Sequence, residues 1–173
     1  MILGLDISTS IVGATVLNEA GEMVYCEAWD LRNKTKFPDL YSKAVFVRGK
    51  LWEVDDEFGI NKIFIEQSLL AFRPGLSSAR TIFTLAKFNG IVSYICQDCF
   101  TEPEYIGAST ARKACGIKVP KGKKAKQTVL DFLLDNDSSF SVEYTRHGNP
   151  KPGSYDRADS YIIAKAGWKN TQS

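Results

Sequence analysis

The sequence lacks the long apolar runs that a membrane span requires. No stretch of the 173 residues approaches the roughly 18 consecutive apolar residues of a transmembrane helix. The start Met-Ile-Leu-Gly has no basic segment of the kind that opens a signal peptide. We therefore expect a cytoplasmic protein, in a bacterium or a virus-infected host cell. A hydrophobic content of 44% is enough for a core, and the length predicts a single domain over residues 1–173.

Cysteine and histidine are scarce, with four and one respectively. Cys96 and Cys99 form one Cys-x-x-Cys pair, but no second pair completes a zinc site. The pair falls late in an apolar helical stretch. We expect all four cysteines, which include Cys26 and Cys115, to be buried reduced thiols. Zinc or redox chemistry at the pair is the alternative.

Acidic residues are missing from one segment of the chain, between Tyr105 and Leu130. Seven basic residues lie there: Arg112, Lys113, Lys118, Lys121, Lys123, Lys124 and Lys126. The other 15 basic residues face 20 acidic ones, so the rest of the chain has a net charge of −5. A basic segment on an acidic body favours a surface that binds a polyanion. A solvated lysine-rich loop would have the same composition.

The first seventeen residues contain two apolar runs separated by Ser8, Thr9 and Ser10. This pattern predicts two antiparallel strands joined by a tight turn, and a third strand over residues 23–29 extends the meander. Asp6 stands at the end of the first strand. Because burial of an unpaired charge is costly, Asp6 must be solvated, paired or bound to a metal ion.

Apolar residues spaced three and four apart predict an amphipathic helix over residues 39–58. The apolar run that follows, residues 61–67, is typical of a strand buried on both faces. Because a helix precedes this strand, we expect it to lie parallel to the first one, so that Glu66 and Asp6 emerge at the same edge. Further along, we predict a helix over 77–99, a strand over 102–106, a helix over 123–134 and a last helix from residue 154 or 155 to about 168.

Two carboxylates, Asp156 and Asp159, share one face near the start of the last helix. Either alone could simply cap that helix. The apolar stretch after them predicts a buried helix, which would bring both to Asp6 and Glu66. Four such anions repel one another unless cations neutralise them, and oxygen ligands select Mg²⁺ or Mn²⁺. Two such ions about 4 Å apart can activate a water molecule for phosphodiester cleavage.

Four motifs occur in a characteristic order: GLDIS at 4–8, IEQ at 65–67, KKAKQTVLDFLL at 123–134 and DRADS at 156–160. Together with the order of predicted elements, they resemble the ribonuclease H-like fold and, within it, the RuvC-like Holliday junction resolvases. The resemblance implies an α/β fold with a mixed five-stranded sheet flanked by helices. It also implies an endonuclease of DNA recombination and repair that cuts four-way junctions and leaves 5′-phosphates.

The resemblance implies a catalytic, metal-binding set of Asp6, Glu66, Asp156 and Asp159 that holds two Mg²⁺ ions, with Mn²⁺ as a substitute. The family holds phosphates with lysines near the basic segment, where the register leaves Arg112 or Lys113 and Lys123 or Lys124 as candidates. The full expected DNA-binding set is Arg112, Lys113, Lys121, Lys123, Lys124, Lys126, Phe72 and Arg73.

The family binds junctions as homodimers through its long helix, which implies a dimer seam here over Ala79–Ser93. That seam reads Ala79, Phe83, Ala86, Gly90 and Ser93, and packing on the sheet is the alternative use of this face. The chain departs from its bacterial relatives at Leu69 and Leu70, where those have an aromatic residue. Its polar segment 135–154 is also longer, and Arg146, His147 and Lys151 could add DNA contacts from it.

Other functions remain open. A related nuclease would act on flaps, forks or structured RNA, whereas a non-catalytic DNA-binding relative would not need the intact carboxylate set. Gly-x-Asp followed by Ser-Thr-Ser also resembles the first phosphate loop of the sugar-kinase and actin-like superfamily. Those proteins need two domains and a second phosphate loop, which this sequence does not evidently supply, so we expect no nucleotide cofactor.

Overall fold

The structure is a computed structural model that describes residues 1–67 and 78–172. Its elements are β1 (Ile2–Ile7), β2 (Ile11–Leu17), β3 (Met23–Asp30), α1 (Leu40–Phe58), β4 (Lys62–Glu66), α2 (Ala79–Cys99), β5 (Glu104–Ile106), α3 (Ala108–Ala114), α4 (Ala125–Asn136) and α5 (Ser154–Thr171). Leu69 and Leu70, where the bacterial relatives have an aromatic residue, and the expected DNA contacts Phe72 and Arg73 lie outside the described residues.

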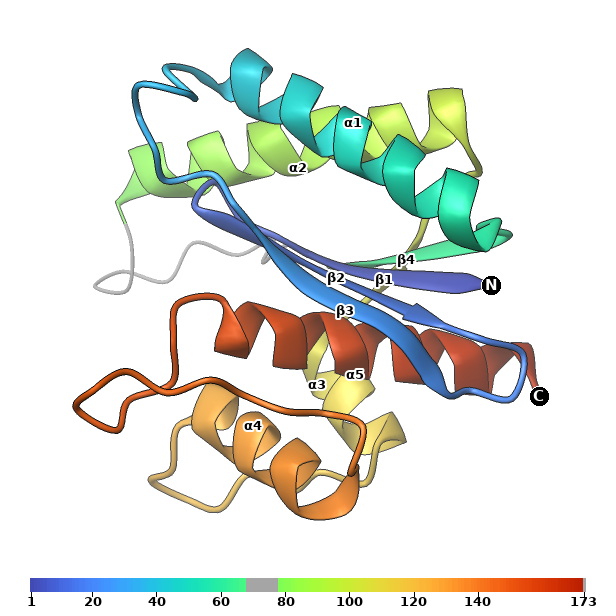
Figure 1. Cartoon of the computed structure of the whole chain (residues 1–173), viewed down its shortest axis with the longest axis vertical. Helices are drawn as coiled ribbons and strands as arrows, with labels where there is room; N and C mark the ends of the chain where they lie inside the picture. The colour runs from blue at the N-terminus through green and yellow to red at the C-terminus, as the bar shows by residue number, and fades with distance from the viewer. Residues whose placement is uncertain (68–77, 173) are drawn as a thin grey trace.

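The five strands form one mixed sheet in the order β3-β2-β1-β4-β5. β1 pairs antiparallel with β2, and β2 with β3, whereas β4 lies parallel to β1 and β5 parallel to β4. Helices α1 and α2 cover one face of the sheet, and α5 covers the other with α3 and α4 outside it (Figure 1). The predicted α/β architecture is therefore confirmed.

Alternation along the strands divides the molecule into two cores. Leu3 and Leu5 of β1 belong to the core under α1 and α2. Ile2 belongs to the core under α5, so the face that carries Ile2, Gly4 and Asp6 is the one that α5 covers. The odd and even positions of one short strand thus separate a purely apolar side from the side that carries the carboxylate.

Glycines allow α5 to approach the sheet closely. A Cβ on Gly4 would lie 2.5 Å from the backbone nitrogen of Ala164. A Cβ on Gly13 would lie 2.5 Å from the carbonyl carbon of Asp156 and closer still to its oxygen. Contacts this short do not occur between real atoms, so a side chain at either position would push α5 away from the sheet.

Several predicted boundaries were wrong by a few residues, and one helix was missed. β5 begins at Glu104 rather than 102, and α5 continues to Thr171 rather than ending near 168. The short helix α3 was not predicted, because it presents a single buried residue, Ala111, and so has no apolar periodicity. None of the helices within the described residues combines the length and the apolar character needed to cross a bilayer.

Candidate active site

The expected carboxylates come from three elements. Asp6 lies next to last in β1, and Glu66 is the last residue of β4. The parallel register pairs Gly4 with Phe64, which places Asp6 and Glu66 side by side two residues further on. Asp156 and Asp159 stand in the first two turns of α5, against the same face. The structure therefore brings strand ends and helix start together as the sequence predicts.

Three of the four carboxylates form a tight group. Oxygen atoms of Asp6, Glu66 and Asp159 all lie within 4.8 Å of one another. Asp159 is buried, and the other two are partly buried. Asp156, one turn earlier on α5, influences Asp6 electrostatically from outside this group.

Burial and mutual repulsion disfavour the charged forms of these carboxyl groups. Burial, followed by the negative charges of Glu66 and Asp159, raises the pKa of Asp6 well above its usual value. Burial and then Asp159 raise the pKa of Glu66 to about 7. Burial also raises the pKa values of Asp156 and Asp159. Without a cation, the surroundings therefore favour the protonated forms of these carboxyl groups.

Lys126, in the first turn of α4, is the basic residue that reaches this group. Its Nζ lies 3.2 Å from Oδ2 of Asp159. Burial works to lower the pKa of Lys126, but Asp159 and Asp6 together raise it above its usual value. Lys126 therefore stays charged, and it offsets part of the repulsion among the carboxylates.

Among the other expected basic residues, Arg112 also acts on the carboxylates. Arg112 of α3 lowers the pKa of both Glu66 and Asp159 by its charge, against the larger effect of burial. Arg112 and Lys113 line a hollow of about 300 Å³. Lys123 and Lys124 line a second one of about 550 Å³. Lys121 is exposed on the loop that leads to α4.

The donor set fits a hard divalent cation. Three carboxylates offer one oxygen each within a space small enough for a single ion to contact all of them. Oxygen ligands of this kind suit Mg²⁺ or Mn²⁺ rather than softer metals. Because burial, and then the charges of neighbouring carboxylates, raise the pKa values of Asp6 and Glu66, a cation at this position would favour their ionised forms beyond the effect of Lys126.

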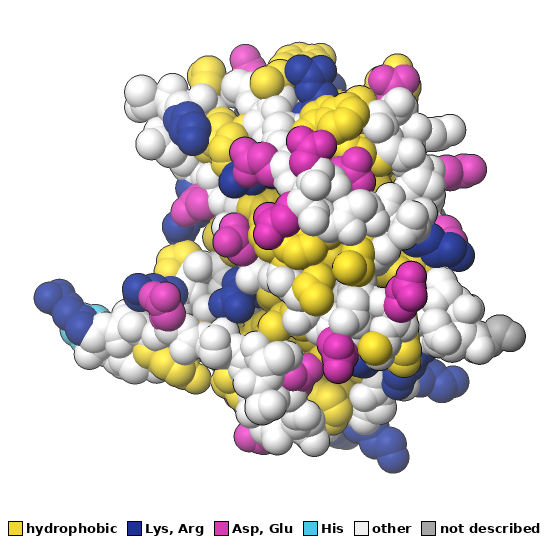
Figure 2. All heavy atoms as spheres, turned by 45° about the vertical axis from the view of Figure 1, so that its right-hand side comes forward, with side chains coloured by type: hydrophobic (Ala, Val, Ile, Leu, Met, Phe, Trp, Pro, Cys, Tyr) yellow, Lys and Arg dark blue, Asp and Glu magenta, His cyan; other side chains and the backbone are white. Residues whose placement is uncertain are grey.

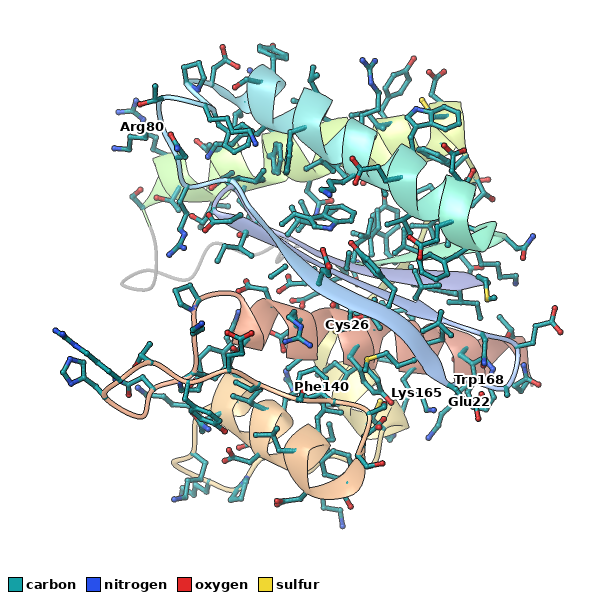
Figure 3. The ribbon with its side chains drawn as sticks, viewed as in Figure 1. Glu22, Cys26, Arg80, Phe140, Lys165 and Trp168 are labelled. Carbon is teal, nitrogen blue, oxygen red and sulfur yellow. The ribbon has the colours of Figure 1, made fainter. Side chains whose placement is uncertain are left out.

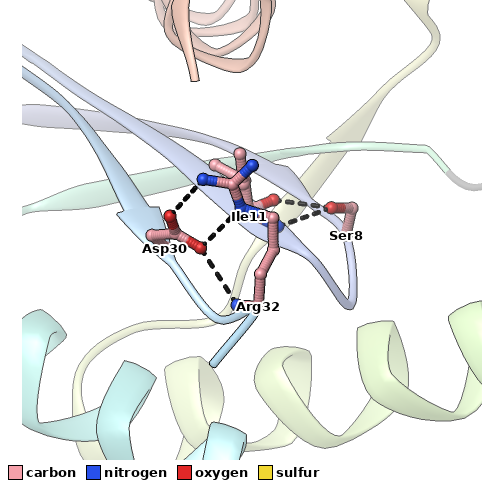
Figure 4. Close-up of polar contacts among 4 residues, drawn as sticks. All are labelled: Ser8, Ile11, Asp30 and Arg32. Atoms are coloured by element: carbon pink, nitrogen blue, oxygen red, sulfur yellow. Dashed lines mark hydrogen bonds and ion pairs between the residues drawn. The ribbon is translucent and has the colours of Figure 1, made fainter. Parts of the chain in front are cut away.

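One basic residue near the site was missed in the sequence. The Asp30 carboxylate accepts from Nε of Arg32 at 2.9 Å, from its Nη2 at 2.6 Å and from its backbone nitrogen at 3.0 Å (Figure 4). The positive charge of Arg32 opposes the effect of burial on the pKa of Asp156. The Asp-x-Arg pattern at the end of a strand could have identified Arg32 in the sequence, because the Asp30 carboxylate holds its guanidinium in place.

The serine-rich turn before β2 is closed on itself. Ser8 Oγ accepts from the backbone nitrogen of Ile11 at 3.0 Å and donates to the Ile11 carbonyl at 2.7 Å (Figure 4). Leu31 at the end of β3 donates its backbone N–H to the carbonyl of Ser10 at 2.8 Å. The turn therefore joins β1, β2 and the end of β3 at the edge where Asp6 lies.

No family model matches the chain, and neither does any curated protein sequence. Solved structures do match. The RuvC of T. thermophilus in complex with a Holliday junction substrate superposes with a TM-score of 0.65 at 12% identity, covering 99% of this chain and 95% of that chain. A second Thermus thermophilus RuvC structure gives 0.61 at 14% identity, with coverages of 99% and 95%.

A eukaryotic protein shares the same architecture. The yeast mitochondrial Holliday junction resolvase Ydc2 gives a TM-score of 0.60 at 15% identity, covering 97% of this chain and 77% of that chain. At such low identity these matches establish the fold. The chain therefore has the RuvC-like, ribonuclease H-like fold over nearly its whole length, as the motifs had implied.

Proposed function

We propose that this chain of RuvC-like fold is a metal-dependent endonuclease that cleaves four-way DNA junctions. The observation that carries the proposal is the convergence of Asp6, Glu66 and Asp159 at the edge of the sheet where β1 and β4 end. Structures of the same fold include a RuvC in complex with a Holliday junction substrate, which supports this choice of substrate.

Each carboxylate has a role in the proposed mechanism. Asp6, Glu66 and Asp159 would hold Mg²⁺, and Asp156 would complete the set from the preceding turn of α5. Two such ions bound there would supply an activated water and would stabilise the leaving oxygen, and cleavage would leave a 5′-phosphate and a 3′-hydroxyl. The burial of Asp159 keeps its carboxylate fixed relative to β1 and β4.

The basic residues would position the DNA strand. Lys126 is paired with Asp159, and in the proposed mechanism it would contact the scissile phosphate. Arg112 lies near enough to act on Glu66 electrostatically, and with the hollows around Lys113, Lys123 and Lys124 it offers sites for the neighbouring phosphates.

The proposed enzyme acts as a homodimer through α2. Of the seam from Ala79 to Ser93, Ala79, Ala86 and Gly90 are exposed and Phe83 is 75% exposed, whereas Ser93 is buried on the face that packs on the sheet. Packing on the sheet instead uses residues such as Phe88, so it does not account for this exposed apolar face. A two-fold pair of subunits would present two sites to symmetric strands of a junction.

Neutralising single carboxylates tests the proposal. Asp6→Asn and Glu66→Gln are assayed with Mg²⁺ on junction, fork, flap and RNA–DNA hybrid substrates, beside Asp56→Asn, which removes an exposed carboxylate on α1. We expect the wild type and Asp56→Asn to cut the junction at the same rate, and both site variants to lose cleavage by at least about 100-fold. Unchanged cleavage by the site variants contradicts the mechanism. If the wild type cleaves forks, flaps or hybrids but not junctions, the proposed substrate is wrong and the cleaved one takes its place.

A further inference from the structure

The polar segment before α5 contains a hairpin arm, which we define as residues 143–151. Tyr144 and Pro150 form an antiparallel bridge, and the backbone nitrogen of Thr145 donates to the carbonyl of Asn149 at 2.8 Å. The backbone nitrogen of Lys151 donates to the carbonyl of Glu143 at 2.8 Å, and their side chains form an ion pair. This part of the expected long loop is thus a defined β-hairpin.

The base of the arm is fixed to the body of the molecule. On the incoming side, Phe140 (Figure 3) is only 3% exposed, and the guanidinium of Arg157 lies 5.3 Å from the centre of its ring. Arg157 also donates from Nη1 to the carbonyl of Ser141 at 3.1 Å and from Nε to the carbonyl of Cys26 at 3.0 Å. Arg157 of α5 therefore holds the residues that lead into the arm against β3.

The outgoing side is fixed just as closely. Gly153 has a φ of +92°, and a Cβ there would lie 2.5 Å from Cβ of Ala28 on β3. Ser154 Oγ donates to the carbonyl of Lys151 at 2.8 Å. The arm therefore enters α5 along one path, and Asp156 follows five residues after its last residue. A rigid connection sets the position of the arm relative to the carboxylates.

The tip of the arm projects from the body. In Figure 1 the arm extends to the left, the side on which the β1–β2 turn and the starts of α4 and α5 also lie. Figure 2 shows it as a narrow protrusion whose end carries basic and histidine side chains. Arg146 and His147 are exposed, with Nε of Arg146 donating to Nε2 of His147 at 3.0 Å, and Tyr144 is 52% exposed below them.

We propose that the tip of this arm, through Arg146 with His147, contacts the sugar–phosphate backbone of a DNA duplex beside the active site. A guanidinium suits phosphate, and a polar tip without an apolar cluster suits DNA rather than a protein surface. Lys151, expected among the DNA contacts, is instead paired with Glu143 and stiffens the arm. The inference rests on the proposed function for the identity of the substrate.

Metal-free binding measurements test the arm. The double variant Arg146→Ala/His147→Ala is compared with the wild type and with Lys62→Ala, which removes an exposed charge at the opposite end of β4. Each is titrated at several salt concentrations with a junction of long arms, a junction of short arms and a linear duplex. We expect the double variant to reduce the salt slope by about 1 on the long-armed junction and the linear duplex, with an affinity loss of about fivefold. Short arms should abolish the difference, and Lys62→Ala should match the wild type.

The outcomes separate this inference from the proposed function. Equal salt slopes for the double variant and the wild type on long-armed DNA overturn the inference that the arm contacts DNA, even where the wild type cuts junctions. A wild type that binds linear duplex but neither prefers nor cuts junctions contradicts the proposed function. In that case, a reduced salt slope of the double variant on the linear duplex would still support a contact between the arm and DNA. A shift in sedimentation of the double variant without DNA would identify the arm as a contact between protein chains and overturn the inference.

Discussion

Adding one methyl group at Gly13 should displace the start of α5. Gly13 pairs with Asp6 across β1 and β2, and its α-carbon faces the first turn of α5. A Cβ there would lie 2.5 Å from the carbonyl carbon of Asp156 and 3.2 Å from the nitrogen of Arg157, where ordinary contacts are 3.4–4 Å. The start of α5 must therefore retreat by at least about 1 Å, a displacement that can cost a well-positioned site about 100-fold in rate.

The same displacement has a cost in stability. Inserting a methyl group into a packed interface typically costs about 1–3 kcal/mol. Gly13→Ala is compared with Gly49→Ala, because Gly49 lies in α1 with nothing within 4 Å of the added carbon and should gain up to about 1 kcal/mol. Urea unfolding followed by circular dichroism measures stability, and junction cleavage measures the site. The double variant tests whether cleavage stays low when stability is restored.

The result that refutes this reasoning is a Gly13→Ala protein with wild-type stability and cleavage. Such a protein would show that α5 does not depend on the close approach at β2. Recovery of cleavage in the double variant would contradict a displaced site and attribute the loss to unfolding alone.

Three further predictions concern charge and assembly. The pKa of Glu66 is about 7 in the folded protein and 4.5 in the unfolded chain, so the folded state binds the proton more tightly. The melting temperature in EDTA should therefore decrease as the pH rises from 4.5 to 7, and Mg²⁺ should raise the melting temperature more at pH 8 than at pH 5. A melting temperature that rises with pH over this range would contradict this. Lys126→Met should destabilise the metal-free protein, because it removes the cation 3.2 Å from Asp159, and should slow cleavage; equal stability and rate would refute that role. Phe83→Asp should convert a dimer to a monomer in sedimentation while changing the unfolding free energy of the single subunit by less than about 0.5 kcal/mol, since Phe83 is exposed; an unchanged dimer would exclude this face.

Much of the fold was predictable because its elements have periodic apolar patterns. β1, β2, β4 and α1 each bury a regular set of side chains, and their order then places Asp6 and Glu66 at one edge. Asp159 followed from its position at the start of a buried helix. These expectations needed only local patterns and the direction of the strands.

The remainder depends on contacts between distant parts of the chain. Lys124 and Lys126 are equivalent by composition, and the path of the chain into α4 decides that Lys126 meets Asp159. The requirement for Gly13 becomes visible only when α5 lies against it. The hairpin arm is built from polar residues without apolar periodicity, and the contacts of Arg157 that fix its base cross from α5 to β3 and to residue 141.

The distribution of the carboxylates along the chain has a consequence for synthesis. Asp6 and Glu66 leave the ribosome early, whereas Asp159 is added only after α4 has been made. At about 5–20 residues per second, roughly 8–30 s separate the first carboxylate from the last. During that interval the nascent chain lacks the third oxygen donor of the group. If the group is the centre of a nuclease, DNA in the same compartment is protected from incomplete copies, and cutting begins only when α5 has docked.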